Sequence, residues 1–101
     1  MLAVAAEARK AYVNAVAAEH AAQYAAQVKD SAEAGAELAL RMRQAGNFSK
    51  FDHAREQAFY AESAAQLAKA RQRSVMARER LTRTMGLWGL GDSIQVAGSS
   101  A

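Results

Sequence analysis

The sequence predicts an all-α protein that folds as one long antiparallel helical hairpin. Alanine accounts for 27 of the 101 residues, and proline is absent. Alanine has the highest helix propensity and loses no side-chain entropy on folding, so this composition favours long helices. A helical pattern runs without a break over residues 3–45, and it restarts after a turn at 46–49 to continue over 50–85. We therefore expect a hairpin within residues 1–90.

The first predicted helix carries a regular series of small residues. They recur at steps of three and four, which is the spacing of the seam of a left-handed coiled coil. Lys29 is the one break in the series. Alanine at seam positions lets two helices approach more closely than leucine would. The series consists of Ala8, Ala11, Ala15, Ala18, Ala22, Ala25, Ala32, Ala36 and Ala39.

The second predicted helix shows a similar series, which we interpret as the matching seam. Folding the chain back near residue 46 sets Ala39 opposite Ala54 and Ala25 opposite Ala68, with other alanines paired between them. A coiled coil with alanine on both sides would follow. The expected second seam consists of Phe51, Ala54, Ala58, Ala61, Ala65, Ala68, Gln72 and Val75.

Larger apolar side chains fall outside both alanine series. Alanine methyl groups bury little area, so a hairpin seamed by alanine alone gains little from burial. We expect the larger residues to contact further helices, which makes the hairpin one part of a bundle. They are Val13, His20, Tyr24, Val28, Leu38 and Met42 on the first helix, and Tyr60, Leu67, Leu81, Met85 and Trp88 on the second.

The turn has a complete explanation in backbone chemistry. Gly46 suits the left-handed conformation that ends a helix. Ser49 is a favourable N-cap, Lys50 would be the first helical residue, and Asp52 stands where a capping box places its acid. Phe48 has no role in this scheme, so local packing and contact with a partner are both open for it.

The end of the second helix is predicted near Met85–Gly86. Four of the six glycines and three serines lie within residues 86–101. Glycine is the preferred residue just after a helix. We expect residues 91–101 to form a flexible C-terminal tail.

Composition excludes several functions. The chain has no cysteine, so it has no disulfides and no thiolate metal ligands. His20 and His53 lie far apart on different helices, which argues against a metal site. No pairing of nucleophile and base, no glycine-rich phosphate loop and no apolar run long enough to span a membrane is present. We expect no enzyme activity, no metal and no cofactor.

Four segments resemble the outer-membrane efflux family, the TolC-type channel proteins. "AYVNAVAAEH" at 11–20 is similar to the opening of that family's long periplasmic helix, and "AELALRMRQAGNFSKFDHAREQ" at 36–57 to its helix–turn–helix pattern. "AESAAQLAKARQRSVMARERL" at 61–81 is similar to its return helix, and "LTRTMGLWG" at 81–89 to the L-x-x-L-M-G that closes it. The resemblance covers residues 8–90, and Asn47 departs from it by replacing an aliphatic residue.

The resemblance implies a structural and interaction role. Proteins of that family are trimeric conduits in which each protomer contributes two such hairpins to a periplasmic α-barrel, and adaptor proteins dock at the hairpin tips. We expect one such hairpin here, located at the outer membrane and periplasm as part of a parent protein. We expect no leader or membrane span in this chain, and we expect it to be a fragment, a truncated product or a reduced relative. The residues expected to bind a periplasmic adaptor, called the tip residues below, are Ala45, Gly46, Asn47, Phe48, Ser49, Lys50 and Asp52. We also expect a homo-oligomer, which is a trimer in the family and a dimer or other bundle for this chain alone.

Two rival functions follow from other features. Residues 69–83 hold six basic side chains and one acid, and the net charge is +3. A basic, alanine-rich helical protein would bind nucleic acid through this run, but such a run is more often a solvated helix face, and no nucleic-acid partner is expected. A lipid-coating helix pair would need wide faces of large apolar residues, which the alanine series do not provide.

Overall fold

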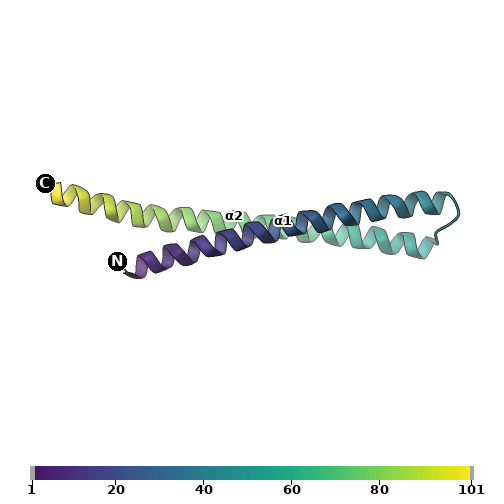
Figure 1. Ribbon diagram of the computed structural model, residues 1–101, viewed down its shortest axis with the longest axis horizontal. Coiled ribbons are helices and arrows are strands. Elements are labelled where there is room, and N and C mark those ends of the chain that lie inside the picture. The colour runs from purple at the N-terminus through teal and green to yellow at the C-terminus, as the bar shows by residue number, and fades with distance from the viewer. Residues whose placement is uncertain (1, 101) are drawn as a thin grey trace.

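The protein is a hairpin of two helices joined by one short turn. A computed structural model describes the backbone of residues 2–100 and the side chains of residues 2–87. Helix α1 spans Leu2–Gln44 and helix α2 spans Lys50–Ser100. They run antiparallel and side by side, and α2 continues past the N-terminal end of α1 (Figure 1). The molecule measures 80 × 18 × 13 Å, so the prediction of an all-α, long antiparallel hairpin is confirmed.

The face of α1 that packs on α2 is the alanine series. Six of these alanines are buried and the other three are half-buried. Lys29, the one break in the series, is accommodated because its ammonium group reaches out of the interface and pairs with Glu33 Oε2 at 3.2 Å. The hydrogen bond and negative charge of Glu33 raise the pKa of Lys29 above its ordinary value. The buried alanines are Ala8, Ala11, Ala22, Ala32, Ala36 and Ala39, and the half-buried ones are Ala15, Ala18 and Ala25.

The face of α2 that packs on α1 differs from the expected one. The alanines assigned to this seam all lie on the solvent side of the hairpin, so that part of the prediction was wrong: Ala54, Ala58, Ala61, Ala65 and Ala68 are exposed, as are Phe51, Gln72 and Val75. A different series with the same three-and-four spacing faces α1. It consists of His53, Glu56, Tyr60, Ser63, Leu67, Ala70, Ser74, Ala77, Leu81 and Thr84, all buried or half-buried.

The physical reason for the choice of face is the size of the side chains. A close approach of two alanine series would bury only methyl groups, whereas Leu67, Tyr60 and Leu81 bring large apolar surfaces onto the flat alanine face of α1. Leu67 is only 6% exposed. Small residues such as Ser63 and Ser74 alternate with these large ones along α2, which lets the large side chains interlock with the small residues of α1.

The axial register of the hairpin matches the predicted fold-back. Ser74 Oγ lies 2.9 Å from Glu19 Oε2. Moving six positions along each helix from this pair leads to Ala25 and Ala68, one of the pairs that the fold-back sets level with each other. The level of each residue along the hairpin therefore agrees with the prediction. The difference is that α2 is rotated about its own axis, so that another of its faces packs on α1.

Helix α2 also continues beyond its predicted end. The backbone stays helical through Ser100, where the prediction placed the end near Met85–Gly86 and a flexible tail over 91–101. Gly86 does not adopt a positive φ, and a glycine within a helix costs only about 1 kcal/mol, which lowers helix stability without breaking the helix. The side chain of Trp88, predicted as a packing residue, lies outside the described side chains.

Candidate functional site: the hairpin tip

The end of α1 is closed by a Schellman motif centred on Gly46. Gly46 has φ 82°, the left-handed conformation that glycine adopts without steric cost. Its N–H donates to the carbonyl oxygen of Arg43 at 2.9 Å, and the N–H of Asn47 donates to that of Met42 at 2.8 Å. These are the two hydrogen bonds that define the motif. They satisfy carbonyl groups that the end of the helix would otherwise leave unpaired.

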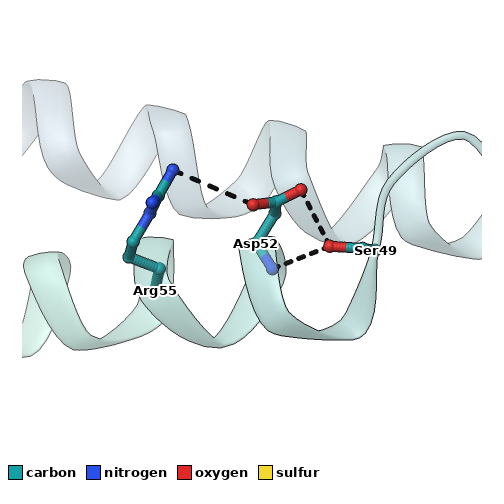
Figure 2. Close-up of polar contacts among 3 residues, drawn as sticks. All are labelled: Ser49, Asp52 and Arg55. Carbon is teal, nitrogen blue, oxygen red and sulfur yellow. Dashed lines mark hydrogen bonds and ion pairs between the residues drawn. The ribbon is translucent and has the colours of Figure 1, made fainter.

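The start of α2 is capped by Ser49, as predicted. Ser49 Oγ accepts a hydrogen bond from the backbone N–H of Asp52 at 3.0 Å and donates one to Asp52 Oδ2 at 2.8 Å (Figure 2). The Asp52 carboxylate thus accepts from the hydroxyl group of the cap residue. Arg55 extends this chain of contacts with a 3.8 Å ion pair to Asp52 Oδ1. The predicted cap therefore forms, with helix α2 starting at Lys50.

One side-chain contact joins the two helices next to the turn. The guanidinium group of Arg43 lies 3.0 Å from His53 Nδ1. Because arginine has only donors, His53 Nδ1 acts as the acceptor in this contact. Arg43 belongs to the last turn of α1 and His53 to the first turn of α2, so this contact holds the base of the turn closed.

The capping leaves a small set of side chains free to meet a partner. Ser49 and Asp52 use their polar groups on each other, whereas Asn47 and Lys50 are exposed and Phe48 is half-buried. Phe51, assigned to the seam by the sequence, is instead 73% exposed beside the tip. The position of Phe51, three residues after Phe48 and next to Lys50, is the sequence signal that could have assigned it to the tip.

A cation accompanies this exposed aromatic ring. The guanidinium carbon of Arg55 lies 5.9 Å from the centre of the Phe51 ring, within the range of a cation–π contact. The tip therefore combines two phenylalanines with the positive charges of Lys50 and Arg55. Such a surface suits an apolar partner surface that carries acidic groups at its edge.

The basic run of α2 does not form a single stripe. Arg71 and Arg78 line one side of the hairpin together with Glu19, and Arg78 forms a 3.2 Å ion pair with that glutamate. Arg73 and Arg80 line grooves on the opposite side. A duplex bound along the helix would meet only part of this charge, so the arrangement gives the nucleic-acid hypothesis little support.

The described part of the chain contains no cluster suited to metal chemistry and no candidate membrane span. Among its side chains, no group of three or more His, Asp or Glu residues is placed to hold a metal ion. Neither helix, over the residues that could be searched, has a stretch long and apolar enough to cross a bilayer. Comparisons with known protein families, curated protein sequences and solved structures found no match to this chain.

Proposed function

We propose that this chain is a non-enzymatic structural and interaction element, equivalent to a periplasmic α-barrel hairpin of an outer-membrane efflux-type channel, whose tip binds a periplasmic adaptor protein. Transport of small molecules would then occur only in a full-length parent at the outer membrane. The proposal rests on the order of the four family-like segments and on the chemistry of the tip.

The observation that carries the proposal is the aromatic pair at the end of a long hairpin, with Phe51 exposed and Phe48 half-buried. The Schellman motif and the Ser49 cap satisfy the backbone of the turn, so Phe48 and Phe51 are not needed to form it. Exposing a phenylalanine costs free energy that contact with a partner would recover. A hairpin 80 Å long places this contact far from the other end of the molecule.

The proposal is tested by binding of the purified chain to a purified periplasmic adaptor that co-purifies with efflux channels. We expect Phe51→Ser and Lys50→Glu each to weaken binding about tenfold or more, as substitutions at the centre of an interface do. Val75→Ser is the control, because Val75 is also an exposed apolar residue on α2 but lies far from the tip. Equal losses for Phe51→Ser and Val75→Ser, or no loss for either, would count against docking at the tip.

A further inference from the structure

An open groove runs between the two helices on one side of the hairpin. Its volume is about 390 Å³, and the residues that line it include Tyr24 and Val28 of α1 and Phe59 of α2. Tyr24 is 69% exposed and Phe59 is 51% exposed. Meanwhile no described side chain is fully buried, and Leu67 is the only buried one among them larger than alanine or serine. The hairpin thus leaves most of its large apolar side chains exposed, while its core is made mainly of small residues.

The edge of this groove on α2 is a second regular stripe. Its members step by three and four, as in a coiled-coil seam, and flank the face that packs on α1. They are Phe59, Glu62, Gln66, Lys69, Arg73 and Met76. Glu62 and Arg73 are exposed, and neither forms an ion pair or hydrogen bond with another described side chain of the hairpin. This stripe therefore has charges and apolar groups available for another molecule.

The stripe is self-complementary when reversed. Glu62 and Arg73 lie equally far from the point between Leu67 and Ala68, and so do Phe59 and Met76. A helix with this pattern, placed antiparallel to a copy of itself about that point, sets each glutamate opposite an arginine and each phenylalanine opposite a methionine. Opposite charges attract across such an interface, and methionine sulfur makes favourable contacts with aromatic rings.

We propose that this groove binds a second copy of the chain, forming an antiparallel dimer with two-fold symmetry about the level of Leu67. The dimer is a four-helix bundle in which α2 packs on α2 and α1 packs on α1 of the second copy. An isologous interface requires one patch to complement itself, which is the property the stripe shows. At about 1.5 Å per residue, Tyr24 lies roughly 2 Å from the level of the two-fold axis, so the two exposed rings meet there.

The register makes unfavourable contacts as well. On α2 it sets Asp52 opposite Arg83 of the second copy, which is attractive, and Arg55 opposite Arg80, which is repulsive. On α1 it sets Lys10 level with Arg41, which is also repulsive.

A parallel dimer, in which α1 stacks on α2 of the second copy, would set Glu62 near Ser31 and Arg73 near His20, so neither of these charges would meet an opposite one. Among its other charged pairs, Asp52 with Arg41 would be attractive and Arg83 with Lys10 would be repulsive. Of the two forms, only the antiparallel one pairs the charges that line the groove, Glu62 and Arg73, and Arg80 is a position where a substitution improves it.

Sedimentation equilibrium of the full chain from about 5 to about 200 micromolar tests the dimer. We expect the wild type to dimerise, and Glu62→Arg and Arg73→Glu each to raise the dissociation constant about tenfold, because each change converts two attractive pairs into repulsive ones. The double variant Glu62→Arg/Arg73→Glu restores the pairs with reversed sign and returns to within about threefold of the wild type. Arg80→Glu tightens the dimer, a gain that misfolding cannot mimic.

Glu37→Arg is the matched control, because it removes an exposed ion pair with Arg41 on α1, away from the groove, and leaves the dissociation constant unchanged. A wild type that stays monomeric throughout would overturn the proposal, and so would single variants that dimerise normally or a double variant that fails to recover.

The chain has no cysteine, so a mixture of Glu62→Cys and Arg73→Cys chains gives an independent check. Oxidation should give predominantly the mixed dimer, whereas crosslinking of each variant only to itself would contradict the antiparallel register. None of these outcomes depends on docking at the tip.

Discussion

Ser74 on α2 donates a hydrogen bond of 2.9 Å to Glu19 on α1, joining two residues that are 55 positions apart in the chain. Ser74 is buried in the helix interface, and the same Oε2 atom of Glu19 also receives Arg78 at 3.2 Å. Away from the turn, this cluster is the one place among the described residues where polar side chains of α1 and α2 form a hydrogen bond or an ion pair with each other. It fixes the relative position of the helices more specifically than alanine packing can.

This contact predicts a pH dependence of stability. The hydrogen bond from Ser74 is the largest cause that lowers the pKa of Glu19 below its ordinary value of 4.5, with a smaller contribution from the charge of Arg78. A carboxylate with a lowered pKa in the folded state stabilises the fold above its ordinary pKa and loses that contribution as the pH falls through the folded value. We therefore expect the thermal midpoint to fall as the pH drops below about 4.5.

Ser74→Ala provides the test of that explanation. Removing the hydroxyl group should raise the pKa of Glu19 towards its ordinary value, so Glu19 contributes less stability above that pH and the acid-induced loss of stability is smaller than in the wild type. Carbon NMR titration of the Glu19 carboxyl group in both proteins measures this directly. Identical titration curves would show that the Ser74 contact does not control Glu19.

The rotation of α2 predicts opposite effects for one substitution at two alanines. Ala36 is buried in the interface, so Ala36→Leu forces the helices apart and should destabilise the fold by about 1–3 kcal/mol. Ala61 is exposed, and Ala61→Leu should change the free energy of unfolding by less than about 0.5 kcal/mol. Urea unfolding at low protein concentration compares the two. A larger loss for Ala61→Leu would indicate that the alanine series of α2 is the packed one.

Two glycines should respond in opposite ways to alanine. Gly46 has a positive φ, so Gly46→Ala should destabilise the hairpin by about 1 kcal/mol even though nothing lies within 4 Å of the added methyl group. Gly86 lies inside α2 in open space, and Gly86→Ala should stabilise the helix by about 0.5–1 kcal/mol. Thermal unfolding followed by circular dichroism measures both. A neutral Gly46→Ala would contradict the left-handed conformation of the turn.

The turn and the axial register could be predicted from the sequence because each depends on local chemistry. Gly46, Ser49 and Asp52 are residue types with strong positional preferences at helix ends, and a single turn between two helices fixes which residues lie level with each other. The packing face of α1 could also be predicted, because the other faces of this helix, such as those with Val13 or Arg41, carry no comparable regular series of one residue type.

The face of α2 could not be predicted in the same way. Two series with the same spacing compete on this helix, and periodicity alone does not rank them. The outcome depends on the area that Leu67 and Tyr60 bury against α1, which is a property of both helices together. The same ambiguity led to Phe51 being assigned to the seam when it lies exposed at the tip.

The extent of α2 was missed for a different reason. Glycine is a frequent stop signal, but it ends a helix only where the chain adopts the left-handed conformation, as at Gly46. Nothing at Gly86 requires that conformation.

The most direct test of the account is a crosslink from the tip to a periplasmic adaptor. A photoreactive amino acid at position 48, in the full chain mixed with a purified adaptor, should form a covalent adduct with the adaptor. The same group at position 65, in the exposed middle of α2, is the control and should form none. The account predicts an adduct at position 48 alone. No adduct at position 48, or equal adducts at both positions, would contradict docking through the tip.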